Sequence, residues 1–146
     1  MILFLDFDGV LHSELAAEAD LFGLLPRFES ILRDFPDVQI VISSSWRENA
    51  SLDDLRARFS PDIARRIIGT TPVIPRVKQM VAHREQEILN WLESAGKRRE
   101  PWLALDDTEW QFKDHRDHLI LCVRHRGLDD AVEAALRVRL SGRAST

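Results

Sequence analysis

The chain has 146 residues, a length that fits one domain, and 45% of them are hydrophobic, an ordinary value for a globular protein. A formal net charge of −4 gives no general case for nucleic-acid binding, and no apolar stretch reaches the length of a membrane span. The single cysteine, Cys122, excludes an internal disulfide and suits a reducing compartment. We therefore expect one cytoplasmic domain over residues 1–146, in which 141–146 form a loose tail.

The chain begins with a short apolar run, Ile2–Leu5, that ends in Asp6-Phe7-Asp8-Gly9. Such a run predicts a strand buried on both faces. Side chains two apart on extended chain point the same way, so Asp6 and Asp8 are expected to face one space, and Gly9 permits a turn. Two carboxylates in one space repel each other unless a cation lies between them. The stretch predicts a magnesium site with a carboxylate placed to attack, although acids also end strands simply to face water.

The next segments predict a flap, a helix and a second strand. Residues 12–22 suggest a short excursion over the site, and Pro26–Phe35 has the spacing of an amphipathic helix. Val38–Ile42 predicts a strand that runs directly into serines at 43–45. Hydroxyls at a strand end can bind a phosphate or cap the next helix. Ser51 suits the capping role, which leaves the earlier serines for another use.

The second half of the chain predicts more elements of the same two kinds. We expect strands at Ile67–Ile68, Trp102–Leu105 and Leu119–Val123, and helices at Lys78–Ala95 and Leu128–Leu140. The strand that starts at Trp102 also runs straight into acids, Asp106 and Asp107. Trp110 and Phe112, which follow, favour packing over recognition.

This order predicts an α/β protein with a doubly wound, Rossmann-like, five-stranded parallel sheet and helices on both faces. In such sheets the ligand site lies at the carboxyl ends of the strands. Three of the expected strands end there in polar residues: Asp6 and Asp8, Ser43 and Ser44, and Asp106 and Asp107. We take these residues as the candidate site.

The pattern resembles the haloacid dehalogenase (HAD) superfamily of phosphohydrolases over nearly the whole chain, to about residue 140. Four stretches are similar to its motifs in order: Asp6-Phe7-Asp8-Gly9-Val10, the serines after Val38–Ile42, a basic residue opening the helix before the fourth strand, and Asp106-Asp107. The resemblance implies that Asp6 is the nucleophile, forming an aspartyl-phosphate, and that Asp8 is the general acid and base. It implies Mg²⁺ held by Asp6, the backbone carbonyl of Asp8 and Asp107, with Asp106 helping through water.

The phosphate-binding residues are less determined. Either Ser43 or Ser44 can fill the second motif, and we prefer Ser44 because family members often place one small residue before the hydroxyl. Arg84 is our choice for the third motif, where lysine is usual, and Lys78 is its rival. Arg47 is expected either to touch substrate or to lie on the surface.

The gaps between the motifs are too short for a cap domain, so the resemblance implies a capless enzyme on a phosphorylated small molecule or macromolecule. We expect a magnesium-dependent phosphomonoesterase. One alternative is a nucleic-acid-end phosphatase, which the acidic charge disfavours but a basic groove would support, lined by Arg76, Lys78, Arg84, Lys97, Arg98 and Arg99. Another is a non-catalytic phosphate- or partner-binding module. A response-regulator receiver is disfavoured because residues 67–71 provide no phospho-acceptor aspartate.

Overall fold

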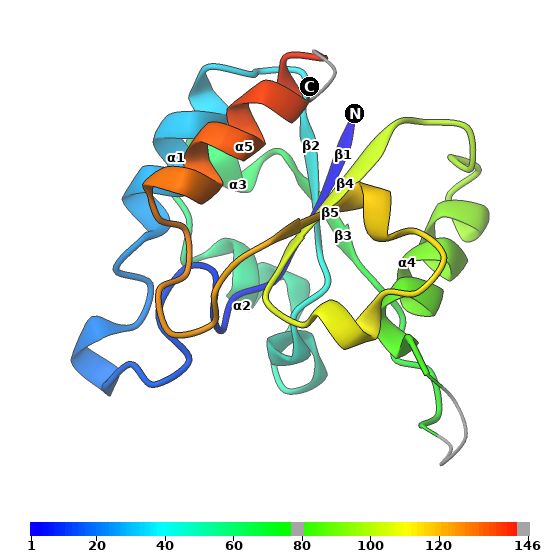
Figure 1. The fold of residues 1–146 in the computed structure, drawn as a ribbon, viewed down its shortest axis with the longest axis horizontal. Coiled ribbons are helices and arrows are strands. Elements are labelled where there is room, and N and C mark those ends of the chain that lie inside the picture. The colour runs from blue at the N-terminus through cyan, green and yellow to red at the C-terminus, as the bar shows by residue number, and fades with distance from the viewer. Residues whose placement is uncertain (77–80, 143–146) are drawn as a thin grey trace.

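The computed structural model describes residues 1–76 and 81–142. Across those ranges, five strands form one parallel sheet in the order β3-β2-β1-β4-β5 (Figure 1). The strands are β1 (Ile2–Leu5), β2 (Gln39–Ile42), β3 (Ile67–Thr70), β4 (Trp102–Asp106) and β5 (Leu119–Leu121). Every residue of the central strand β1 is buried, because the strand has a neighbour on each edge and helices on each face. The predicted five-stranded parallel fold is confirmed.

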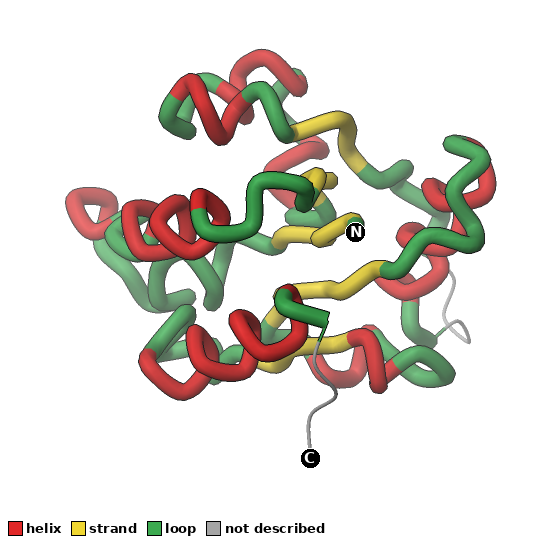
Figure 2. Tube along the Cα trace, turned by 90° about the horizontal axis from the view of Figure 1, so that it is seen from above, coloured by secondary structure: helices red, strands yellow, loops and turns green. Residues whose placement is uncertain are grey.

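Helices cover both faces of this sheet (Figure 2). They are α1 (Leu25–Arg33), α2 (Leu52–Arg56), α3 (Pro61–Ala64), α4 (His83–Ser94) and α5 (Asp130–Leu140). In Figure 1, α1, α3 and α5 lie on one side of the sheet and α4 on the other. The alternation along β1 explains the two core clusters: Leu3 and Leu5 face α1 and α5, whereas Ile2 and Phe4 pack with the α4 residues Ile88 and Leu92.

Several element ends differ from the sequence expectation by a few residues. Helix α1 begins at Leu25 and ends at Arg33, two residues before the expected Phe35. Helix α5 begins at Asp130 because the Asp129 side chain accepts the Val132 N–H at 3.0 Å and caps it. The expected start of the fourth helix at Lys78 lies outside the described residues. So does most of the expected tail, 143–146, whereas Ser141 and Gly142 form a turn after α5.

The excursion after β1 is confirmed as a short segment, with one 3₁₀ turn at Glu18–Asp20. The described part of the chain contains no separate cap domain, and none of its helices has the length and apolar character needed to cross a membrane.

The prediction that Trp110 and Phe112, which follow β4, pack in the core is half right. Phe112 is buried on the α4 face, but Trp110 is 60% exposed because it sits in an outer 3₁₀ turn, Glu109–Gln111.

The chain reverses its direction of travel across the sheet between β3 and β4. It first proceeds outward from β1 to β2 and β3, and then crosses through α4 to β4 on the other side of β1. The connection from β1 to β2 and the connection from β3 to β4 therefore place their helices, α1 and α4, on opposite faces of the sheet (Figure 1). This leaves a crevice between the carboxyl ends of β1 and β4, the position where open α/β sheets bind ligands.

Candidate active site

The strand register brings the candidate residues to one edge. Leu5, the last residue of β1, pairs with Ile42 of β2 and Leu105 of β4. The next residues, Asp6, Ser43 and Asp106, therefore follow at the same level, and the backbone bonds Ser43 N to Leu5 O and Asp6 N to Leu105 O maintain this alignment. Parallel pairing in register thus brings three chain segments that are far apart in the sequence to the same level of the sheet.

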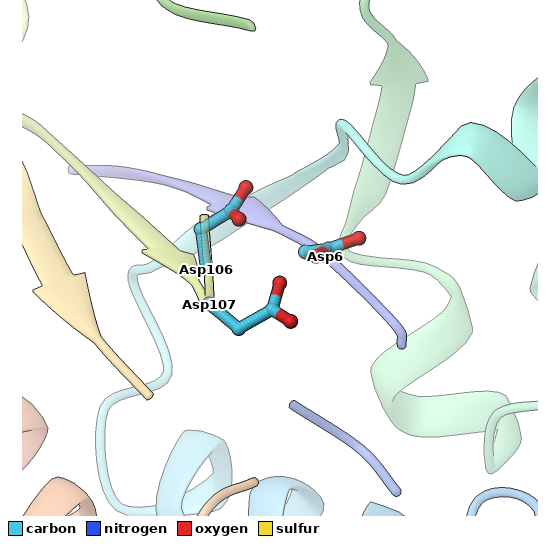
Figure 3. A group of neighbouring side chains, drawn as sticks. All are labelled: Asp6, Asp106 and Asp107. Carbon is cyan, nitrogen blue, oxygen red and sulfur yellow. The ribbon is translucent and has the colours of Figure 1, made fainter. Parts of the chain in front are cut away.

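Asp6, Asp106 and Asp107 lie close together at the carboxyl ends of β1 and β4 (Figure 3). One carboxylate oxygen of each lies within 4.8 Å of the others, the one such acidic group found in the part of the chain that the structure describes. Burial, followed by the charge of Asp106, raises the pKa of Asp6 well above its usual range, and burial also raises the pKa of Asp107. Three mutually repelling oxygens in a buried space are a suitable donor set for a hard divalent cation. The residues present therefore fit a metal of this type.

Gly9 makes this acidic group possible. Its φ of +76° lies in the left-handed region, and a Cβ built there would be 2.2 Å from Asp107 Oδ2. Only glycine lets the chain turn away from Asp8 while Asp107 occupies the space beside it. Gly9 of the first motif is therefore needed to leave room for Asp107 of the fourth motif.

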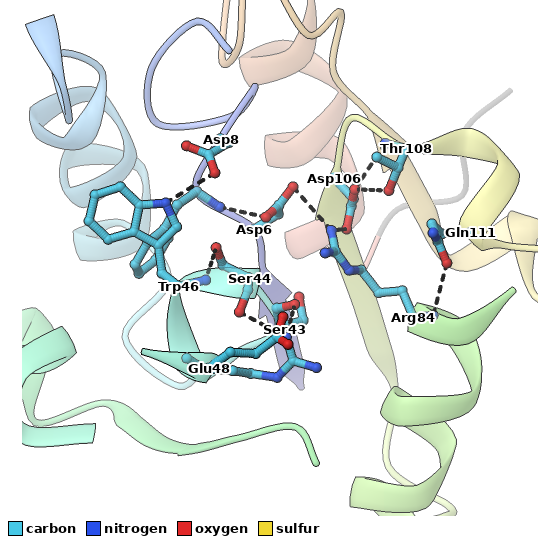
Figure 4. Close-up of polar contacts among 12 residues, drawn as sticks. Asp6, Asp8, Ser43, Ser44, Trp46, Glu48, Arg84, Asp106, Thr108 and Gln111 are labelled. Carbon is cyan, nitrogen blue, oxygen red and sulfur yellow. Dashed lines mark hydrogen bonds and ion pairs between the residues drawn. The ribbon is translucent and has the colours of Figure 1, made fainter. Parts of the chain in front are cut away.

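Arg84 comes from the first turn of α4 and reaches into the same group (Figure 4). Its Nη1 lies 2.8 Å from Asp106 Oδ2 and 3.2 Å from Asp6 Oδ2. Burial disfavours the charged guanidinium, but Asp106 and Asp6 outweigh that effect and hold the pKa of Arg84 above its ordinary value. Arg84 therefore places a permanent positive charge beside both carboxylates.

The start of α4 is tied to the loop after β4. The buried Glu85 carboxylate accepts backbone N–H groups of Lys113 at 3.1 Å and His115 at 2.6 Å. Gln111 accepts the Arg84 N–H at 3.3 Å. These bonds hold the helix terminus, and with it the Arg84 side chain, against the edge that carries Asp106.

The Asp8 side chain lies apart from the acidic group and is about half exposed. His12 Nδ1 accepts the Phe22 N–H at 3.1 Å, so its Nε2 carries the proton and donates to Asp8 Oδ1 at 2.7 Å. Trp46 Nε1 donates to Asp8 Oδ2 at 3.0 Å. Phe22 has a φ of +61°, a conformation that a bulky residue seldom adopts, so the His12 contact is kept at some backbone cost.

The two candidate serines differ in their partners. The Ser44 Oγ is buried, accepts the Trp46 N–H at 3.2 Å and lies on the side of Asp6 (Figure 4). The Ser43 Oγ is buried and has no hydrogen-bond partner among residues 1–76 and 81–142. Each hydroxyl still has a proton to donate. The geometry therefore keeps both serines as candidates for contact with a phosphate.

Arg47 is buried and its donors are taken up within the protein, which corrects the expectation that it touches substrate or lies on the surface. Its side chain is 2% exposed and forms an ion pair at 2.9 Å with Glu87 of α4, whose side chain is 1% exposed. The guanidinium also donates to backbone carbonyls of Ser43, Ser44, Thr71 and Pro72. Burial lowers the pKa of Arg47, and Glu87 opposes this effect. Arg47 therefore joins the serine loop to the helix that carries Arg84.

Among the described residues, Arg84 and Lys97–Arg99 do not form the basic groove that would support a nucleic-acid-end phosphatase. Arg84 lies at the start of α4 and is buried in the site, whereas Lys97–Arg99 follow its end. A helix of 12 residues separates these two places by roughly 18 Å. Lys78, the rival to Arg84, lies outside the described residues.

The sequence profile of a family described as "HAD domain in Swiss Army Knife RNA repair proteins" matches residues 2–132. The chain belongs to this family. No curated protein and no solved structure matches the chain at a significant level.

Membership of the HAD family supports phosphatase-type or other hydrolase chemistry on a phosphorylated substrate. HAD domains typically use a divalent metal, and the group formed by Asp6, Asp106 and Asp107 fits one. The resemblance stated from the sequence, to a small capless HAD domain, is confirmed.

Two residues of this HAD site were missed by the sequence analysis. His12 and Trp46 both donate to Asp8, yet neither belongs to a motif we used. The four-residue spacing from Asp8 to His12 offered a weak local signal. Trp46 is 38 residues away from Asp8 in the chain, and nothing in the sequence pattern indicated the contact.

Proposed function

We propose that this HAD domain is a magnesium-dependent phosphomonoesterase that works through an aspartyl-phosphate intermediate. The observation that carries the proposal is the position of Asp6, which lies buried at the carboxyl end of the central strand beside Asp106, Asp107 and Arg84. A protein that bound no metal would gain no stability from Asp6 at this position, because burial and the repulsion of the neighbouring acids both disfavour its negative charge.

In the first step Asp6 attacks phosphorus, and the bond from phosphorus to the ester oxygen breaks. Asp8 gives its proton to that departing oxygen, so the products are the aspartyl-phosphate and the free alcohol. In the second step Asp8 takes a proton from water, which attacks the aspartyl-phosphate and releases inorganic phosphate. His12 and Trp46 orient the Asp8 carboxylate through its two oxygens.

The phosphate oxygens would be bound by Arg84 and by hydroxyls of Ser43 and Ser44 together with nearby backbone N–H groups. Mg²⁺ would neutralise charge on the phosphate and the carboxylates. Asp6, Asp107 and the Asp8 carbonyl would hold it, with Asp106 acting through water. Arg84 would then be shared between Asp106 and the substrate, since it already lies at 2.8 Å from Asp106.

The test is phosphate release from an aryl phosphate, measured with Mg²⁺ and with a chelator, in wild type and Asp6→Asn. We expect release with Mg²⁺ only, and none above background in the variant, whose fold is checked by circular dichroism. Substantial activity in Asp6→Asn would reject the nucleophile assignment. No release from a folded, Mg²⁺-binding wild type would favour a binding module.

A nucleic-acid-end phosphatase is the second candidate, and the family description, which names RNA repair proteins, favours it. The net charge of −4 and the separation of Arg84 from Lys97–Arg99 by the length of α4 weigh against tight, non-specific RNA binding. Short 5′- and 3′-phosphorylated oligoribonucleotides, compared with sugar phosphates, distinguish the candidates. Affinity for RNA that falls steeply with salt would support this one, and no binding at low salt would exclude it.

A further inference from the structure

A cavity of about 440 Å³ opens beside Asp8, and the residues of the acidic group, Asp6, Asp106 and Asp107, do not line it. It is lined by Asp8, Ser45, Trp46, Asn49, Ala50 and Arg58. Its volume lies within the range of ligand pockets, roughly 300–1,000 Å³. In the proposed reaction Asp8 protonates the departing oxygen, so the group attached to that oxygen extends toward the space that Asp8 lines.

Arg58 is the positively charged residue among those that line this cavity. Its guanidinium carbon lies 4.7 Å from the ring centroid of Phe22 and 4.8 Å from that of Trp46. The side chain is exposed, and it forms no ion pair or hydrogen bond with the residues that the structure describes. Stacking restricts the planar group while leaving the N–H groups on its edge free to donate.

Phe22 and Trp46 are themselves held firmly. Phe22 is bonded through its N–H to His12, and Trp46 is bonded through its ring to Asp8. The two rings pack edge to face at 5.2 Å between centroids. Arg58 is therefore carried by the same aromatic cluster that orients the proposed general acid, at a fixed place relative to it.

We propose that this cavity binds the alcohol part of the substrate, and that Arg58 recognises a second oxyanion on that alcohol. The inference rests on the proposed phosphatase function and deepens it: the substrate is a phosphomonoester whose leaving group carries a further phosphate. Arg58 lines an open cavity, is restricted by stacking and has no side-chain partner among the described residues, so it suits bidentate binding of such an anion. A bisphosphorylated small molecule and a phosphorylated nucleic-acid end both have this chemistry.

The experiment compares substrates that differ only in the second anion. In one arm, phosphate release from adenosine 3′,5′-bisphosphate is compared with release from adenosine 5′-monophosphate. In the other, a 5′-phosphorylated dinucleotide with a natural phosphodiester is compared with one whose linkage is a neutral methylphosphonate. The quantity measured is the ratio of kcat/KM for the substrate with the second anion to that for the substrate without it.

We expect a ratio of about ten or more in wild type in at least one arm, the size of a charge-assisted hydrogen bond to a partly exposed arginine. The arm that shows it identifies the source of the anion. Arg58→Gln should bring the ratio close to one. Arg65→Gln is the matched control, because Arg65 is an exposed arginine just before β3, at the opposite end of the sheet, and it should keep the wild-type ratio.

A ratio near one in wild type in both arms, or an unchanged ratio in Arg58→Gln, would overturn the inference while leaving the phosphatase proposal intact. If none of these substrates is turned over, binding replaces turnover as the readout. Calorimetric titration of Asp6→Asn with adenosine 3′,5′-bisphosphate should then show affinity about tenfold higher than Asp6→Asn/Arg58→Gln shows. Equal affinities would reject the anion subsite.

Discussion

The buried ion pair between Arg47 and Glu87 allows a sharp test of how the site is held together. We consider Glu87→Gln, which removes the negative charge and keeps the side-chain size. A glutamine oxygen can still accept the Ile74 N–H, as Glu87 does at 3.1 Å. The variant therefore isolates the loss of the charge that faces Arg47 at 2.9 Å.

The expected magnitude follows from burial. Both side chains are almost completely shielded from water, at 2% and 1% exposure, so the unpaired guanidinium of the variant cannot be solvated. Breaking a buried pair in this way costs about 3–5 kcal/mol, and we expect the lower end, about 3 kcal/mol, because the backbone carbonyls around Arg47 still accept its donors. In a chain of this size that loss lowers Tm by roughly 9 °C.

The assay is urea unfolding followed by tryptophan fluorescence, with the free energy of unfolding taken from the midpoint and slope. Glu93→Gln on the same helix is the control. Its partner Arg98 is 3.9 Å away and both side chains are largely exposed, so the expected loss is under about 0.5 kcal/mol.

A Glu87→Gln variant no less stable than Glu93→Gln would refute the reasoning and would mean that the carbonyl contacts alone hold Arg47. The double variant Arg47→Met/Glu87→Leu adds a second check. Apolar replacement of a buried pair often restores stability, but here it leaves the carbonyls of Ser43 and Thr71 without their donor. We therefore expect it to remain less stable than wild type.

Three further predictions concern the acidic group and its partners. Gly9→Ala should lower Mg²⁺-dependent activity more than tenfold, measured as kcat/KM, because its Cβ would collide with Asp107 Oδ2 and its φ of +76° disfavours alanine. Arg84→Ala should raise KM for an aryl phosphate more than Lys78→Ala does, and the reverse order would move the third motif to Lys78. In a chelator, wild type should lose stability as pH rises above about 4, because the pKa of Asp6 is higher in the folded than in the unfolded state. Asp6→Asn should lose less over that range and gain less from added Mg²⁺, both followed by Tm; equal responses would argue against a metal at Asp6.

The sequence alone determined the fold class and the edge at which the site lies. Apolar runs short enough for strands, alternating with helical patterns, are local signals, and they placed β1, β2 and β4 within a residue or two of their observed bounds. Asp6 directly follows β1, and Asp106 is the last residue of β4. Since parallel strands place their carboxyl ends at one edge, the meeting of the acids could be inferred without coordinates.

Element ends were less predictable where a single contact sets them. The start of α5 at Asp130 is set by the Asp129 cap. The sequence pattern alone is equally compatible with a helix that begins at Leu128. Trp110 was expected to pack, because aromatic residues usually do so, but the 3₁₀ turn that carries it points it outward. The sequence contains no local signal for that orientation.

Only the tertiary structure decided which charged residues meet. Arg47 and Arg84 are both arginines beside predicted site segments, yet one is buried against Glu87 and the other reaches Asp6. The difference arises because α4 crosses on the face opposite α1, which directs its first turn to the acids and its second turn to the serine loop. Likewise, Trp46 follows β2 and reaches Asp8, which follows β1, only because these two strands are neighbours. Such contacts depend on the packing of whole elements, and spacing along the chain does not encode them.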